Sequence, residues 1–256
     1  MAHLLSDDEL PAFQERRPDG AADFFIVVDH ASAAIPRRLG TLGLPEAERK
    51  RHIAWDIGAL GVATRVSDIL DAHLVAQNYS RLVIDCNRDP AQPSSIASLS
   101  EWTEIPGNIG LSPHDVEARQ REVFQPYHDK IRSVLDARAA AARPTILIAQ
   151  HTMTDLYKNG RRLMQAAILY NRDARFAGAL LEVLRRDPTL TVADNEPYFL
   201  SDDTDYTVPK HAEARGLPYV EIEIRQDLVA DEAGQTAWGD RIAAALLDAQ
   251  QMFQKR

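Results

Sequence analysis

The stretch that decides the fold is Ile26-Val27-Val28-Asp29-His30-Ala31-Ser32-Ala33-Ala34-Ile35-Pro36. The apolar run over residues 24–28 is typical of a buried strand, and it ends abruptly at Asp29 and His30. Open α/β sheets bind their ligands outside the carboxyl ends of the strands, so His30 is placed to reach a metal or a substrate. We expect Asp29 to accept the second ring N–H of this histidine and to fix its tautomer. The alternative is a polar loop that merely caps the strand.

The chain repeats this arrangement twice more. Residues 145–149 form a second apolar run, which ends in Gln150-His151-Thr152, and residues 218–225 alternate like a strand with one polar face. Glu221 and Glu223 lie on that face, where two carboxylates are costly to bury unless a cation lies opposite. Glu223 is nearer the carboxyl end of the strand, so we expect it to reach the site. Glu221 is expected to pair with an arginine behind it.

Predicted helices alternate with these strands along the rest of the chain. They span residues 45–72 (interrupted at 55–58), 113–138 (kinked at Pro126), 174–186, 209–215 and 235–253. Short strands are predicted over residues 74–77, 82–85 and 161–170. This alternation indicates a single α/β domain over residues 1–256, with a mainly parallel or mixed central sheet and helices on both faces. Residues 1–22 are expected to form a loosely packed arm with a short helix near residues 7–14.

The composition excludes several classes of function. An apolar content of 45% in 256 residues is ordinary for a globular protein with a substantial core. The net charge of −9 argues against a nucleic-acid partner. No run approaches the roughly 18 apolar residues of a membrane span, and the first residues lack the apolar core of a signal peptide. A single cysteine, Cys86, suits a reducing compartment, so we expect the protein in the cytoplasm.

The histidines that end buried strands are candidate metal ligands. Two histidines and one carboxylate are a common zinc set in hydrolases, where the fourth position is left open for water. His30 and His151 would supply the imidazoles, but the sequence has no HExxH motif, and Ala33 stands three residues after His30. Asp56 is our candidate for the third ligand, since it stands at the start of a predicted helix. A helix N-cap is the alternative role for Asp56.

Two arginines flank the strand predicted over residues 82–85. They are Arg81, after Ser80, and Arg88, after Asn87. A guanidinium that points into a cleft binds a carboxylate through two parallel hydrogen bonds. The alternative is a structural salt bridge, for instance with Asp85. His211, on a short predicted helix, is a further residue that could face the site.

Taken together, these stretches resemble the N-formylglutamate amidohydrolase family, which is itself similar to zinc carboxypeptidases. The likeness runs from about Phe24 to Leu228. The segments that carry it are, in chain order, Asp29-His30-Ala31-Ser32, Ser80-Arg81, Asp85-Cys86-Asn87-Arg88, Gln150-His151-Thr152 and Glu223-Ile224-Arg225. The sequence departs from the family pattern in the first segment, where Pro-His-Ser-Gly is commoner, and at Cys86, where Leu is usual.

The resemblance implies a zinc-carboxypeptidase-like fold and a zinc-dependent amidohydrolase. Its substrate would be a small N-acylated amino acid that carries a carboxylate, with N-formyl-L-glutamate as the best match. Combined with Asp56 and His211, which were chosen above from the sequence alone, the resemblance gives the following expected roles: zinc ligation by His30, Asp56 and His151, proton transfer by Glu223, oxyanion stabilisation by Arg81 and substrate binding by Asn87, Arg88, Arg225 and His211. Glu223 would take a proton from the attacking water and pass it to the leaving amine.

Two other interpretations remain at this stage. One is another zinc hydrolase of the same fold, such as a carboxypeptidase or an amidase that trims cell-wall peptides. A chain of this length has few elements to spare for an extended peptide cleft, which favours a small substrate. The other is a non-catalytic protein that binds carboxylates or metal. Glu223 discriminates between an enzyme and a binding protein, because binding alone needs no proton acceptor.

Overall fold

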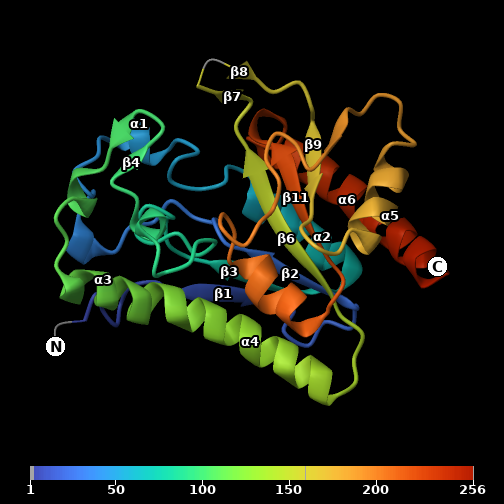
Figure 1. Ribbon diagram of the computed structural model, residues 1–256, viewed down its shortest axis with the longest axis horizontal. Helices are drawn as coiled ribbons and strands as arrows, with labels where there is room; N and C mark the ends of the chain where they lie inside the picture. The colour runs from blue at the N-terminus through green and yellow to red at the C-terminus, as the bar shows by residue number, and fades with distance from the viewer. Residues whose placement is uncertain (1–2, 159, 256) are drawn as a thin grey trace.

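A mixed seven-stranded sheet runs through the middle of the computed structural model, which describes residues 3–158 and 160–255 (Figure 1). Its strand order is β1-β3-β2-β6-β11-β9-β10. The bounds are Phe13–Arg16 for β1, Phe24–Val28 for β2, His73–Gln77 for β3, Ile146–Met153 for β6, Ala166–Leu169 for β9, Val192–Asp194 for β10 and Tyr219–Arg225 for β11. β3, β2, β6 and β11 are parallel to one another. β1 runs antiparallel to β3, and β9 runs antiparallel to β11 but parallel to β10. The predicted α/β domain with a mixed sheet is confirmed.

Helices cover both faces of the sheet, which explains why the central strands are continuously apolar. Along β2, Phe24, Ile26 and Val28 belong to one core cluster, and Phe25 and Val27 belong to another. The first cluster also contains residues of α2 (Ala59–Leu70), α5 (Arg175–Leu184) and α6 (Glu232–Gln254), and the second contains residues of α4 (Gln125–Ala140). Figure 1 shows these two groups of helices on opposite sides of the sheet. Each fully buried side chain of this size contributes about 1.5–3 kcal/mol.

The long helix predicted over residues 113–138 is present, but it is interrupted before its proline. α3 (Pro113–Arg119) begins at the N-cap Ser112, whose hydroxyl accepts a hydrogen bond from the backbone N–H of Asp115. A π-helical turn (Gln120–Phe124) then leads into α4. Pro126 has no N–H to donate to the carbonyl four residues earlier, and the wider turn accommodates this loss. No described helix is both long enough and apolar enough to cross a membrane.

Two predicted elements, one in the N-terminal arm and one over residues 82–85, are wrong. Instead of a helix near residues 7–14, the arm contributes β1, which pairs with the free edge of β3, so tertiary pairing outweighs local helix propensity. The arm is also anchored, since Leu4 is buried and its N–H donates to Glu122. Residues 82–85 are turns rather than a strand. Their side chains are buried like those of a strand, but Val83 N–H donates to the Ser80 carbonyl and Asp85 N–H to the Ser95 carbonyl.

Two small hairpins and several short helical turns complete the described chain. The hairpins are β4 (Leu99–Ser100) with β5 (Thr103–Glu104), and β7 (Leu156–Tyr157) with β8 (Gly160–Arg161). The short helices are α1 (Glu46–Arg49), four 3-10 turns (Arg37–Leu39, Pro93–Ile96, Pro106–Asn108 and Gln226–Leu228), and a π-helical turn (Val208–Ala212) followed by a 3-10 turn (Glu213–Arg215). The strand predicted over residues 161–170 is thus divided between β8 and β9, and β10 was not predicted. The helical segment predicted over 209–215 does end at Gly216, which has a left-handed backbone.

Candidate active site

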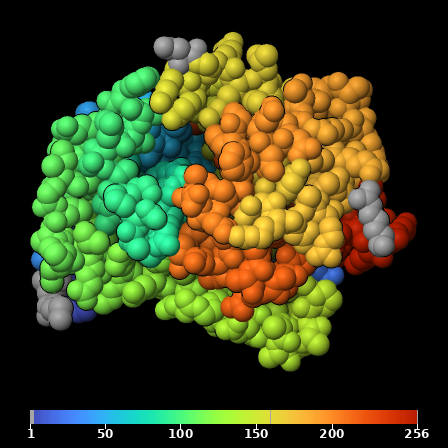
Figure 2. Space-filling model, in the orientation of Figure 1, coloured from blue at the N-terminus to red at the C-terminus, as the bar shows by residue number. Residues whose placement is uncertain are grey.

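The carboxyl ends of β2, β6 and β11 open into a cavity of about 990 Å³. Residues 81–101 line one side of it, and the β7–β8 hairpin and residues 197–205 line the other. Figure 2 shows the mouth as a hollow between the green segment around residue 100, the yellow hairpin and the orange loop around residue 200. The cavity is lined by seven of the nine residues that were predicted to form the site: His30, Asp56, Arg81, Asn87, Arg88, His151 and Glu223.

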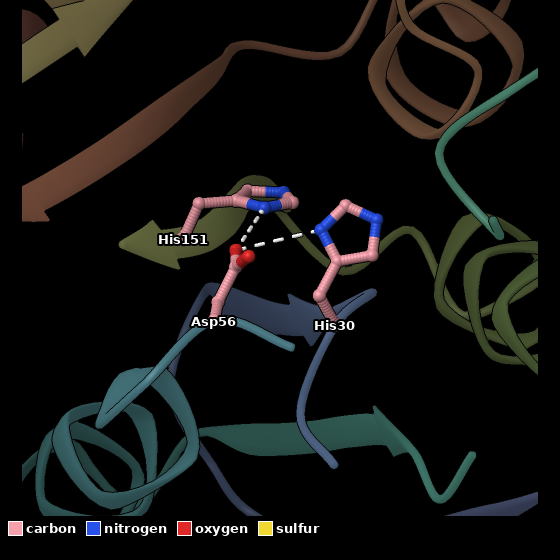
Figure 3. A group of neighbouring side chains, drawn as sticks. All are labelled: His30, Asp56 and His151. Atoms are coloured by element: carbon pink, nitrogen blue, oxygen red, sulfur yellow. Dashed lines mark hydrogen bonds and ion pairs between the residues drawn. The ribbon is translucent and has the colours of Figure 1, made fainter. Parts of the chain in front are cut away.

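The three predicted metal ligands lie together at the base of the cavity (Figure 3). His30 follows β2, Asp56 precedes α2, and His151 lies within β6, which extends four residues beyond its predicted end. One ligand atom from each residue lies within 4.8 Å of the others. Asp56 Oδ2 is 3.4 Å from Nδ1 of His30 and 2.8 Å from Nδ1 of His151. The N-cap of α2 is Gly58, so Asp56 does not cap that helix.

Each imidazole has a second carboxylate against its other nitrogen. His30 Nε2 lies 2.7 Å from Asp85 Oδ1, and His151 Nε2 lies 3.3 Å from Asp29 Oδ2. The prediction that Asp29 orients His30 is therefore wrong, since neighbouring residues at a strand end point in different directions. Asp29 is itself held by the Thr207 hydroxyl, which donates to Oδ1 at 2.7 Å. Such outer carboxylates fix the orientation of metal-binding histidines.

The donor set fits a divalent metal ion. If His30 donates its Nε2–H to Asp85, its Nδ1 is a lone pair that faces an Asp56 oxygen, and this buried nitrogen has no hydrogen-bond partner among the described residues. Two acceptors that face each other need a cation or a proton between them. Five buried carboxylates surround the site, and burial raises the pKa of two of them, Glu221 and Glu223. Among the described residues, the one guanidinium that forms ion pairs with these carboxylates is that of Arg81. Two imidazoles with a carboxylate suit zinc and similar metals.

Glu223 lies beside this group because β11 pairs with β6 in parallel, with Glu223 opposite His151. Burial raises the pKa of the Glu223 carboxyl to about 7. The Tyr198 hydroxyl donates to Oε1 at 3.3 Å, whereas buried Oε2 has no hydrogen-bond partner in the described structure. A carboxylate in a cavity with a pKa near neutrality has the property that a general base requires.

Glu221, one strand period earlier, is also buried in the cavity wall. Burial raises the pKa of its carboxyl well above the usual value, which favours the protonated form. Its Oε2 lies 4.0 Å from His151 Nε2. Within the described ranges Glu221 forms no ion pair with an arginine, so the predicted arginine partner is wrong.

Arg81 combines the two roles that the sequence left open for it. Its Nη2 lies 2.6 Å from Asp85 Oδ2, and its Nη1 lies 3.6 Å from Asp56 Oδ1. The side chain also lines the cavity. Arg81 is therefore both a salt-bridge partner and a fixed positive charge beside the metal-ligand group.

Asn87 and Arg88 also line the cavity, but they differ in how many of their polar groups are engaged. The Asn87 amide accepts backbone N–H groups from Tyr206 and Thr207 and donates to Asp205 at 2.9 Å. Arg88 donates from Nη1 to the carbonyls of Asn87 and Thr204. Asn87 thus holds the loop around residue 205, whereas Nε and Nη2 of Arg88 have no partner among the described residues.

Arg225 and His211 do not line the cavity. Arg225, at the end of β11, donates to Asp227 and to the carbonyls of residues 162–164. His211 is buried, and its Nε2 lies 2.9 Å from Nδ1 of His128. Burial, together with the neighbouring imidazole, lowers the pKa of His211 to about 3. Neither residue lines the cavity with Asn87 and Arg88, the other two residues predicted to bind the substrate.

Arg162 and Tyr198 are among the cavity residues that were not predicted from the sequence. Arg162 follows β8, and its Nη1 donates to the Tyr198 hydroxyl at 3.1 Å. Both come from loops, where no apolar periodicity indicates the direction of a side chain. The only signal was the pair Arg161-Arg162 beside aromatic Tyr157, which is too common to single out.

Comparisons with known proteins agree with this architecture. The model of the N-formylglutamate amidohydrolase family matches residues 22–230. The structure is similar to that of a gene product from Agrobacterium tumefaciens, with 36% sequence identity and a TM-score of 0.95 over 98% of this chain and 100% of that one. It is also similar in fold to N-formylglutamate amidohydrolase from Ralstonia eutropha JMP134, with 18% identity and a TM-score of 0.73 over 96% of this chain and 99% of that one. None of the curated proteins matches the sequence.

Proposed function

Because the chain belongs to the N-formylglutamate amidohydrolase family, and is thus a hydrolase that acts on an amide bond, we propose that it is a zinc-dependent enzyme for small N-acylated amino acids. N-formyl-L-glutamate is the proposed substrate, and formate and glutamate are the products. The observation that carries the proposal is the buried group of His30, Asp56 and His151 with Glu223 beside it in one cavity. We place the reaction in the cytoplasm, in keeping with the single cysteine.

In the proposed reaction, each of these cavity side chains has a separate role. Zinc held by the three ligands would polarise the amide carbonyl and lower the pKa of water toward about 7. Glu223 accepts a proton from the attacking water as the new C–O bond forms, and it then transfers that proton to the leaving nitrogen, after which the C–N bond breaks. Arg81 stabilises the negative charge that develops on the amide oxygen. Arg88 binds a carboxylate of the substrate through its uncommitted N–H groups.

A second candidate is a carboxypeptidase or peptide amidase of the same fold. The volume of about 990 Å³ favours it, since pockets of this size enclose ligands much larger than N-formylglutamate. Exposed apolar side chains on the cavity walls, such as Tyr157, Leu163 and Phe199, could contact such a substrate.

A metal analysis and a substrate screen test the proposal together. The purified protein is expected to contain about one zinc per chain, the stoichiometry of a mononuclear hydrolase site. It should release formate from N-formyl-L-glutamate faster than it cleaves N-acetyl-L-glutamate or dipeptides. Faster cleavage of the peptides would favour the second candidate. A metal-loaded protein that cleaves none of these compounds would be a binding protein, and the proposed reaction would be wrong.

A further inference from the structure

We infer that Arg162 binds a second carboxylate of the substrate, so that the cavity selects dicarboxylic amino acids such as glutamate over neutral ones. This inference rests on the proposed function, in which Arg88 binds the first carboxylate. Arg162 lies in the wall of the cavity that carries the β7–β8 hairpin, away from the segment around Arg81 and Arg88. It is not one of the three predicted metal ligands.

Contacts on several sides hold the guanidinium of Arg162 in place. Nη1 donates to the Thr154 carbonyl at 3.3 Å and to the Tyr198 hydroxyl at 3.1 Å. Cζ, the central carbon of the guanidinium, lies 4.9 Å from the centre of the Tyr198 ring and 5.4 Å from the centre of the Tyr157 ring. An arginine restrained in this way loses little conformational freedom when a ligand binds, which favours its use in recognition.

Among the described residues, Arg162 has no carboxylate in ion-pair contact, although its charge acts on Glu223 from farther away. Arg81, by contrast, is paired with Asp85, and Arg88 lies 4.0 Å from Asp205. Nε and Nη2 of Arg162 also have no hydrogen-bond partner within residues 3–158 and 160–255. These two nitrogens form the edge of the guanidinium that binds a carboxylate through two parallel hydrogen bonds. A half-buried cation with this edge free is complementary to an anionic group of a ligand.

The position of Arg162 relative to the reacting groups fits the side chain of glutamate. The Tyr198 hydroxyl accepts from Arg162 and donates to Glu223 Oε1, so one hydroxyl separates the guanidinium from the proposed base. In the proposed reaction the leaving nitrogen lies next to Glu223, which protonates it. The side-chain carboxylate of glutamate is four bonds from that nitrogen, or roughly 5 Å at ordinary bond lengths. It can therefore reach Arg162 while the α-carboxylate turns toward Arg88.

Calorimetric binding of L-glutamate and L-glutamine to the zinc-loaded protein tests the inference without requiring turnover. The two compounds differ only in the charge and hydrogen bonding of the side-chain end. The wild-type protein is expected to bind glutamate at least about tenfold more tightly, the size of effect expected for one well-placed charged pair. Arg162→Met, which keeps an unbranched apolar side chain against the two tyrosines, should bring the two affinities within about twofold and leave that for glutamine unchanged.

Arg161→Met is the matched control, since it removes the same charge from the neighbouring residue, which lines the same cavity but is exposed. It should retain the preference for glutamate, and an unchanged melting temperature in both variants would exclude a folding defect. The inference is wrong if wild-type protein binds glutamate and glutamine equally or binds neither, or if both variants lose the preference to the same extent. A preference lost only in Arg162→Met, in a protein that cleaves no N-acyl amino acid, would refute the proposed reaction and keep the binding site.

Discussion

His30 and His151 occupy equivalent places in the site, because each imidazole lies between Asp56 and an outer carboxylate. His30→Ala and His151→Ala are each expected to lose most of the bound zinc, since the remaining ligands are too few for a closed coordination shell. Metal content after dialysis, measured by mass spectrometry, checks this. Asp56→Ala should lose zinc as well, because Asp56 does not cap a helix.

His211→Ala is the control for these variants, since it removes a buried histidine that lies outside the cavity. It should lower stability and keep the zinc. Full zinc occupancy in His30→Ala and His151→Ala would show that the metal site lies elsewhere.

Glu223→Gln preserves the shape of the side chain and removes its ability to accept a proton. Zinc content should be nearly unchanged, while the turnover number falls on the order of 10²–10⁴-fold, the usual contribution of a positioned general base. Glu221→Gln should cost less, because burial raises the pKa of the Glu221 carboxyl well above its usual value and disfavours the charged form that a base requires. Turnover and zinc content measured on the same preparations separate the roles. If zinc and turnover fall together in Glu223→Gln, then Glu223 is a ligand rather than the base.

At the residue scale, the sequence predicted which residues reach the site better than it predicted their hydrogen-bond and ion-pair partners. His30, His151 and Glu223 could be predicted because each lies at or near the carboxyl end of a buried strand. There the sheet determines where the side chain points. The outer carboxylates were misassigned, since Asp85 reaches His30 from a turn that resembles a strand in the sequence. Arg225 shares a strand with Glu223, but hydrogen bonds to Asp227 and three carbonyls draw it away from the cavity.

At the scale of the elements, β2 makes a prediction about stability. Ile26 is fully buried between the sheet and the helices that cover it, so Ile26→Ala should lower the free energy of unfolding by about 2–5 kcal/mol through lost contacts and a residual cavity. Ile69 of α2, which is 43% exposed, is the matched control. Its replacement by Ala should change stability by roughly 0.5 kcal/mol or less. Urea unfolding of the two variants measures both values, and equal losses would contradict the assignment of β2 to the core.

The contact between α4 and the Val208–Ala212 turn is expected to be sensitive to acid. It contains His128 and His211, whose rings stack 5.2 Å apart, and burial lowers the pKa of His128 to about 4 and that of His211 to about 3. Both histidines take up protons at about pH 6.5 in the unfolded chain, which therefore binds more protons than the folded protein at lower pH. The stability that they confer is complete above that pH and is lost as the pH falls toward 4.

Urea midpoints measured between pH 7.5 and pH 5 test this expectation. The His128 contribution alone should lower the free energy of unfolding by on the order of 2 kcal/mol at pH 5. His128→Phe should show a shallower decline over the same range, because one of the two groups that gain protons on unfolding is absent. Identical slopes in the variant and in the wild-type protein would rule out this pair as the source.

The elements themselves could be predicted wherever periodicity is strong, as in β2, β6, β11 and α6. The wrongly predicted elements have a common cause. Whether a segment pairs as a strand depends on hydrogen-bond partners elsewhere in the chain, which the local sequence does not show. Residues 13–16 form a strand because β3 presents a free edge to them, and residues 82–85 do not because their N–H groups bond within turns and to the loop around Ser95. Two-residue strands such as those of the hairpins are too short for any pattern.

At the scale of the whole molecule, the size of the cavity could not be predicted. The length of the chain suggested few elements to spare for a large cleft, yet two hairpins and a loop build walls around about 990 Å³. Long-range contacts place these walls, as when Lys158 Nζ lies 5.5 Å from the rings of both Trp102 and Tyr157 and so joins the two hairpins. Such contacts connect segments that are far apart in the sequence, so no local pattern predicts them.

The spread of the metal ligands along the chain predicts that zinc stabilises the fold as a whole. His30, Asp56 and His151 meet only when β2 and β6 are paired, so zinc binds the folded protein in preference to the unfolded chain. At a free concentration 1,000 times the dissociation constant, such binding adds about 4 kcal/mol to the free energy of unfolding. A chelator should lower the melting temperature of the wild-type protein, and added zinc should restore it. Asp56→Ala should not respond, and a wild-type protein that is equally insensitive would contradict the coupling.

The crowding of five buried carboxylates around the site then has a consequence for the lifetime of the protein in the cell. Without a metal ion, Arg81 offsets only part of their negative charge, and the remaining repulsion favours opening of the structure around the site. Proteases cleave chains that open, at a rate set by how often they do so. Zinc starvation should therefore reduce the amount of this protein as well as its activity.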